Sequence, residues 1–194
     1  MEIETIREFF DDLADTWDRD LIIDPGIVNS ILDNAAVSKG KTILDVACGT
    51  GVLMPFYLER EVKCVTAVDL SPKMIAVALE KYDDQRISFI CGDILDVSLP
   101  QKYDCIVVYN AFPHFSDQRG LIKRLSSLLK DGGTLTIAHG MSRERINAHH
   151  DAAAMGVSLG LMEAHELEKL FLEHLSVKTV ISDEKMYEVV GIKE

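Results

Sequence analysis

The stretch Ile43-Leu44-Asp45-Val46-Ala47-Cys48-Gly49-Thr50-Gly51 decides the fold. It begins within Thr42–Val46, a short apolar run of the kind that forms a buried strand. Gly49 and Gly51 then allow the backbone to turn sharply and to approach a ligand closely. We expect a helix over Gly51–Arg60. Ligands of open α/β sheets bind outside the carboxyl ends of the strands, so the loop predicts a binding site there. A tight turn without a ligand is the alternative for the loop taken alone.

Around this loop, short apolar strands alternate with helices. Further strands are predicted at Val62–Asp69, Ile87–Cys91, Tyr103–Tyr109 and Thr134–His139, and helices at Pro72–Tyr82 and Gln118–Leu129. This alternation predicts a parallel sheet that is covered by helices on both faces. Beyond a helix at Glu163–His174, the runs Ser176–Ile181 and Met186–Ile192 have the spacing of a hairpin. The last strand should therefore run antiparallel.

Composition narrows the classes of partner. The 194 residues contain 20 basic and 32 acidic side chains, a net charge of −12 that disfavours nucleic acid as a partner. No apolar run approaches the roughly 20 residues of a membrane span, so no membrane partner is expected. The N-terminus MEIETIREFF shows no secretory signal. The four cysteines form no CxxC pair and lie in or beside predicted strands, which suggests buried, reduced thiols and a cytoplasmic location.

Acidic residues follow successive strands of the predicted sheet. Asp69 ends the second strand, where a carboxylate can accept both hydroxyls of a ribose, as in NAD or S-adenosylmethionine. The dinucleotide fingerprint fails, because Met54 stands where a third glycine should follow Gly49. Asp45 would repel a pyrophosphate but suits a cationic ligand. Asp93 can accept a hydrogen bond from an adenine amino group, or simply cap a short turn.

With these residues in place, the chain resembles the class I S-adenosylmethionine-dependent methyltransferases of the small-molecule type, which have a Rossmann-like fold. The motifs that carry the resemblance occur in the family's order: LDVACGTG (Leu44–Gly51), VDLSPKMI (Val68–Ile75), GDILD (Gly92–Asp96), YDCIVVYNAFPHF (Tyr103–Phe115) and LLKDGGTLTIAH (Leu128–His139). The resemblance spans Lys41 to Glu194. It implies an α/β fold with a seven-stranded, mostly parallel sheet, an antiparallel last strand and helices on both faces.

The resemblance also implies which residues bind S-adenosylmethionine and its product S-adenosylhomocysteine. They follow the strand ends in order: Asp45, Ala47, Gly49 and Gly51 at the methionine part, Asp69, Leu70 and Met74 at the ribose and adenosine, Asp93 and Ile94 at the adenine, and Asn110 at the amino group. Ala47 departs from the family pattern, which has a glycine there. Trp17, the only tryptophan, lies in an aromatic N-terminal stretch that closes over the cofactor in small-molecule members; packing of a helix against the sheet is the alternative.

The sequence predicts a single domain, residues 1–194, with four parts. Residues 1–40 hold two helices, Ile3–Asp15 and Asp24–Val37, which we expect to cap one edge of the sheet. Residues 41–139 form the cofactor-binding core, and residues 163–194 form the C-terminal helix and hairpin. Residues 140–162 are too long for an ordinary connection and are expected to act as a lid on the acceptor side.

Histidines gather at the predicted acceptor side. His114, His139 and His149 are candidate catalytic residues, as general bases or as groups that orient the acceptor. Solvated or capping histidines are a second interpretation. A third is a metal ion held by His139, His149 or His150, with His114 or Asp151. We assign no metal ligand.

We therefore predict direct in-line transfer of a methyl group to a small-molecule acceptor, by a monomer or homodimer. The fourth strand ends in Asn110-Ala111-Phe112-Pro113, which is not the (D/N)PP(Y/F) tetrad that aligns exocyclic amines. Alignment and desolvation would supply much of the rate. The alternatives are methylation of a protein or another macromolecule, a non-catalytic module that binds S-adenosylmethionine, and an NAD-dependent dehydrogenase.

Overall fold

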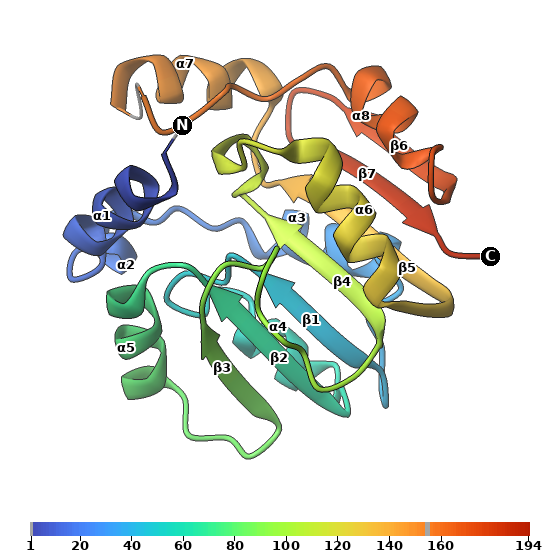
Figure 1. Ribbon diagram of the computed structural model, residues 1–194, viewed down its shortest axis with the longest axis horizontal. Coiled ribbons are helices and arrows are strands. Elements are labelled where there is room, and N and C mark those ends of the chain that lie inside the picture. Colours follow the sequence, from blue (N-terminus) through green and yellow to red (C-terminus); the bar gives the residue numbers. More distant parts are fainter. Residues whose placement is uncertain (1, 154–155) are drawn as a thin grey trace.

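The computed structural model describes residues 2–153 and 156–194, without the side chains of residues 20 and 149–153. Seven strands form one sheet in the order β3-β2-β1-β4-β5-β7-β6 (Figure 1). The strands are β1 (Thr42–Val46), β2 (Cys64–Asp69), β3 (Ile87–Cys91), β4 (Tyr103–Tyr109), β5 (Leu129–His139), β6 (Ser176–Ser182) and β7 (Tyr187–Ile192). Strands β1 to β5 pair in parallel, and β7 runs antiparallel to both β5 and β6. The predicted fold class is confirmed.

Helices cover both faces of the sheet (Figure 1). They are α1 (Ile3–Leu13), α2 (Trp17–Asp20), α3 (Pro25–Asn34), α4 (Met54–Glu59), α5 (Pro72–Lys81), α6 (Gln118–Leu128), α7 (Arg143–Ala153) and α8 (Ala164–Phe171), with a short 3-10 turn, η1 (Phe112–His114). Buried side chains of α6 and α8 pack with strand residues in one core cluster, and those of α3, α4 and α5 pack in another. Within the described residues, no helix is long and apolar enough to cross a membrane.

The N-terminal helices differ from the expected edge cap. Helix α3 packs on a face of the sheet, because Val28 and Leu32 contact the core cluster that includes Ile43 of β1. The carboxylate of Asp24 caps this helix by accepting hydrogen bonds from Gly26 N and Ile27 N. Only α1 and α2 remain near the carboxyl ends of the parallel strands (Figure 1).

Three local predictions were wrong. The helix after the glycine loop begins at Met54 rather than Gly51, because residues 50–53 form a turn. Strand β5 begins at Leu129 rather than Thr134, because Leu129 already pairs with Tyr103 before an irregularity shifts the register. Cys91 is exposed although the other cysteines are buried or half-buried.

Candidate cofactor and acceptor site

A cavity opens at the carboxyl ends of β1, β2, β3 and β4. Because these strands are parallel and adjacent, the residues that follow each of them meet at one edge of the sheet (Figure 1). Eleven residues singled out from the sequence line this cavity: Trp17, Asp45, Ala47, Gly49, Asp69, Leu70, Met74, Asp93, Ile94, Asn110 and His114.

Asp69 joins two of the loops that line the cavity. Its Oδ2 accepts a hydrogen bond from Gly49 N at 2.8 Å, and its Oδ1 accepts one from Ser71 N, also at 2.8 Å. Each carboxylate oxygen has a second lone pair, so ribose hydroxyls can still donate to it. Burial raises the pKa of Asp69 to about 6, against the opposing effect of the two backbone donors.

Asp45 is a buried carboxylate that fits a cationic ligand. Asp45 is 2% exposed, and its Oδ2 has no hydrogen-bond partner within the described part of the chain. Burial raises the pKa of Asp45 well above its ordinary value, and the nearby charge of Asp69 adds to the effect. A buried carboxylate is costly unless it is neutralised or paired. The cationic amino and sulfonium groups of S-adenosylmethionine would supply the missing charge.

The loop after β1 has a left-handed backbone at three positions. The φ angles are 56° at Ala47, 54° at Gly49 and 84° at Gly51. Gly51 does not line the cavity, but a Cβ atom there would lie 2.7 Å from Cε2 of Tyr82. Glycine at position 51 therefore leaves room for the Tyr82 ring, and a side chain there would force the loop or the ring to move.

The turn after β3 forms the part of the cavity where the resemblance predicts the adenine to lie. Asp93 Oδ1 accepts a hydrogen bond from Leu95 N at 2.9 Å, which is the short-turn role considered from the sequence. Asp93 and Ile94 also line the cavity, so the turn and a ligand role are compatible. On the opposite side, Asn110 has a φ of 55° and its Oδ1 accepts a hydrogen bond from Gly140 N at 3.0 Å.

Helices α1 and α2 form an apolar roof over the cavity. We define this roof by the lining residues Ile3, Ile6, Phe10, Trp17 and Leu21. The rings of Phe10 and Trp17 meet edge to face, with centroids 5.8 Å apart. The sequence reasoning missed the two isoleucines and Leu21. The spacing of Ile3, Ile6 and Phe10 at i, i+3 and i+7 was the available signal, because it places them on one face of a helix.

Among the histidines whose side chains the structure describes, His114 lines the cavity. Its Nδ1 lies 2.7 Å from the carbonyl oxygen of Val157, and its ring meets that of Phe10 edge to face at 5.0 Å. A carbonyl oxygen only accepts, so Nδ1 carries the proton and Nε2 of the neutral ring carries the lone pair. Burial lowers the pKa of His114, which keeps the ring neutral near pH 7.

The other candidate histidines do not join His114 in the described structure. His139 is 1% exposed, its ring lies edge to face with Tyr187 at 6.1 Å, and it is not among the cavity-lining residues. The side chains of His149 and His150 lie outside the described residues. Among the described residues, no group of three or more histidine, cysteine or acidic side chains is arranged to hold a metal ion.

Comparisons with known proteins agree with this arrangement. A family model described as "Methyltransferase domain" matches residues 43–133. The chain is 34% identical over 128 residues to a malonyl-[acyl-carrier protein] O-methyltransferase of Acetivibrio thermocellus, covering 64% of this chain and 45% of that protein. It is 31% identical over 140 residues to a ubiquinone biosynthesis O-methyltransferase of Coxiella burnetii, covering 68% of this chain and 59% of that protein. The chain thus spans about half the length of these relatives.

A solved structure shares the whole fold. Magnesium protoporphyrin IX methyltransferase from Synechocystis PCC 6803, with bound SAH, superposes with a TM-score of 0.74 at 15% identity. The match covers 100% of both chains. At this level of identity the likeness shows a common fold.

Proposed function

Because the chain belongs to the class I S-adenosylmethionine-dependent methyltransferases, we propose that it transfers the methyl group of S-adenosylmethionine to a small, uncharged acceptor. The row of Asp45, Asp69 and Asp93 around one cavity under an apolar roof carries this proposal. When bound, the cofactor supplies an electrophilic methyl group on a sulfonium.

The acidic row would hold the cofactor in one orientation. Asp69 would accept the ribose hydroxyls, Asp93 the adenine amino group, and Asp45 would face the cationic end. In this orientation the methyl group would lie beyond Asp45, toward Asn110 and His114. Holding both reactants in line supplies much of the rate of such a displacement.

The cavity favours an acceptor without charge. No lysine or arginine is among the lining residues that the structure describes, and residues 149–155 of the lid contain none in the sequence. An anionic acceptor would therefore be desolvated without a basic side chain to pair with it and would lie in a cavity lined by carboxylates, which is unfavourable. The apolar roof instead suits the carbon skeleton of a small phenol or thiol.

His114 would act as the general base for such an acceptor. The hydrogen bond between Nδ1 and the carbonyl oxygen of Val157 orients the neutral ring at the cavity wall, and a neutral imidazole can accept a proton from a hydroxyl or thiol. The lowered pKa keeps this base available at neutral pH. His139 lies off the cavity, and the side chain of His149 is outside the described residues, so neither enters this mechanism.

The test combines binding and turnover. Calorimetry should show S-adenosylhomocysteine binding to the wild-type protein and binding about tenfold weaker to Asp69→Asn. Transfer of labelled methyl groups should then be measured with neutral phenols and thiols and with matched analogues that carry a carboxylate. We expect His114→Gln to lower kcat about 100-fold with a hydroxyl acceptor and to leave cofactor affinity unchanged. The exposed His165, changed to glutamine, is the matched control.

Other outcomes would contradict the proposal. Preference for the carboxylate analogues would exclude an uncharged acceptor. Label that enters only protein in a cell extract would indicate a macromolecular acceptor. Cofactor binding without any methylated product in the extract would indicate a non-catalytic binding module.

A further inference from the structure

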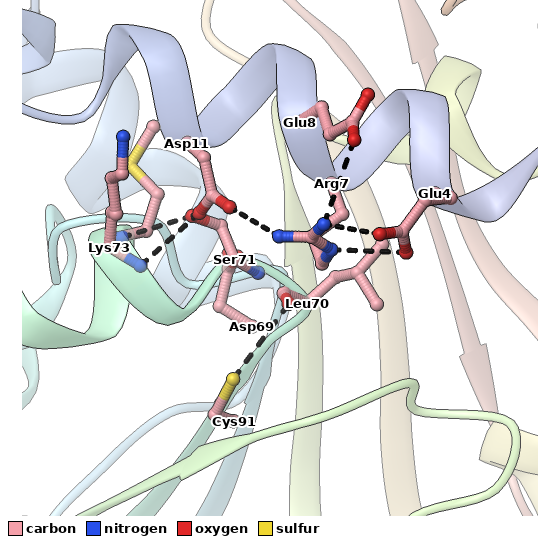
Figure 2. A network of polar contacts seen from close by, with 10 residues as sticks. Glu4, Arg7, Glu8, Asp11, Asp69, Leu70, Ser71, Lys73 and Cys91 are labelled. Carbon is pink, nitrogen blue, oxygen red and sulfur yellow. Dashed lines mark hydrogen bonds and ion pairs between the residues drawn. The ribbon is translucent and has the colours of Figure 1, made fainter.

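Two carboxylates attach the apolar roof to the loops at the cofactor side of the cavity. One is Asp11 of α1, which is 8% exposed. The other is Asp18 of α2. Figure 2 shows Asp11 pointing from α1 toward the turn between β2 and α5. Both carboxylates bind residues next to those that would hold the cofactor.

Asp11 is connected to Asp69 through one residue. Its Oδ1 accepts hydrogen bonds from Ser71 Oγ at 2.5 Å and from Lys73 N at 3.3 Å, and Arg7 binds its Oδ2 at 2.6 Å (Figure 2). The backbone N–H of Ser71 donates to Asp69. Asp11, Ser71 and Asp69 therefore link the roof to the carboxylate that would accept the ribose hydroxyls. Desolvation alone would raise the pKa of Asp11, but the hydrogen bonds from Ser71 and Lys73 and the charge of Arg7 lower it, so the carboxylate stays ionised.

Asp18 makes the second attachment, at the glycine loop. Its Oδ1 accepts a hydrogen bond from Thr50 Oγ1 at 2.5 Å, and its Oδ2 pairs with Lys81 Nζ at 2.6 Å. Thr50 lies between Gly49 and Gly51 and is fully buried. The attachment adjoins Trp17, whose Nε1 would lie 3.9 Å from a Cβ atom at position 49.

Besides these two carboxylates, few buried apolar side chains hold α1 in place. Ile6 and Asp11 are the buried residues of α1, and Ile6 belongs to a small cluster whose other buried member is Val157 of the lid. The apolar side chains of the roof mostly face the cavity and not the core. Since Ile6 is the buried apolar residue of α1, with Phe9 and Phe10 only partly buried beside it, the polar attachments contribute to the closing free energy alongside these contacts.

We propose that Asp11 and Asp18 are positioning residues that hold the roof closed over the cofactor and thereby limit how fast it leaves. This inference rests on the proposed cofactor site. The roof and the cofactor loops share these bonds, so an opened roof also releases Ser71 and Thr50. Neither carboxylate needs to touch the reacting atoms.

The dissociation rate of S-adenosylhomocysteine tests the proposal. It can be followed by stopped flow, with the fluorescence of Trp17, the only tryptophan, as the signal. Asp11→Asn and Asp18→Asn should each raise this rate about fivefold, which corresponds to roughly 1 kcal/mol. Asp18→Glu, which can still reach Lys81, should restore a rate near that of the wild type. Arg119→Met, which breaks an exposed ion pair between α6 and Glu173 in the turn after α8, is the matched control.

The thermal midpoint separates positioning from general stability. A purely structural role would lower the midpoint of both variants and leave the dissociation rate within twofold of the wild type, which would overturn the inference. Failure of the wild-type protein to bind S-adenosylhomocysteine would overturn the proposed function itself. The two failures are therefore distinguishable in one set of measurements.

Discussion

Ala47 has a backbone conformation that its side chain opposes. Its φ of 56° lies in the left-handed region, where a Cβ atom crowds the following carbonyl and costs about 1–2 kcal/mol. The family pattern has glycine at this position. The residue lines the cavity, so the strain lies within the loop that would hold the cofactor.

We expect Ala47→Gly to raise the free energy of unfolding by about 0.5–1 kcal/mol, because relief of strain exceeds the entropy that glycine adds to the unfolded chain. Urea denaturation would measure the change. Gly51→Ala is the matched opposite, because its new Cβ atom would lie 2.7 Å from the Tyr82 ring at a φ of 84°; it should lose more than about 1 kcal/mol. A less stable Ala47→Gly protein would contradict the strain argument.

Single residues differ in how far the sequence reveals them. Asp45 and Asp69 could be placed in one cavity because each lies in the last two residues of a predicted strand of a parallel sheet. Asp11 and Asp18 could not, because an acidic residue on an amphipathic helix usually faces solvent. Their partners, Ser71 and Thr50, come close only through the tertiary fold.

At the scale of elements, α7 is fastened to the segment that leads into α8. Asn147 Oδ1 accepts a hydrogen bond from Leu161 N at 2.6 Å, and Asn147 Nδ2 donates to Leu161 O at 3.1 Å. Arg143 Nε also donates to Leu161 O, at 3.0 Å. The two residues lie four positions apart, about one helical turn, so their side chains share one face of α7.

Replacing Asn147 by alanine should loosen this segment without unfolding the sheet. Both hydrogen bonds to Leu161 would be lost, so amide exchange at 156–163 should rise about tenfold. Hydrogen-exchange mass spectrometry would compare the exchange rate of residues 156–163 with that of β1 and β4, where no change is expected. Arg145→Ala, at an exposed position of the same helix, should exchange like the wild type. Unchanged protection in the Asn147 variant would show that the segment does not depend on the two Asn147 hydrogen bonds.

Elements of the core were more predictable than those around it. Strand β3 was predicted with its observed bounds, because apolar runs between turn residues reflect burial in the sheet. The edge cap was wrong for α3, because a helical period shows which residues are apolar but not which surface they meet. The roof over the cavity depends on which surface each helix packs against, so its contacts could not be predicted from the sequence.

For the molecule as a whole, Glu188 places a carboxylate within the sheet interior. It is fully buried on β7, and its Oε2 accepts a hydrogen bond from Asn34 Nδ2 of α3 at 2.7 Å. Burial raises the pKa of Glu188 to about 7 from an ordinary 4.5. The folded state therefore favours the protonated form, and the protein loses stability as the pH rises through about 7.

Glu188→Gln should remove this dependence. Near pH 8 the variant should be about 2 kcal/mol more stable than the wild type, and near pH 5 the two should be similar, because glutamine stays neutral throughout. Chemical denaturation at both pH values would measure the difference. Glu184→Gln, in the exposed hairpin turn, is the control and should show no such gain. An equal effect at both pH values would indicate packing and not ionisation.

The position of β7 has a consequence for the protein during its synthesis. This strand is the last of the seven to be translated, yet it lies between β5 and β6 and pairs with both. Until residues 187–192 have left the ribosome, β5 has one unpaired edge and β6 has no neighbour in the sheet. A nascent chain at that stage exposes backbone groups that can pair with another chain, so slow translation near this strand favours aggregation over folding.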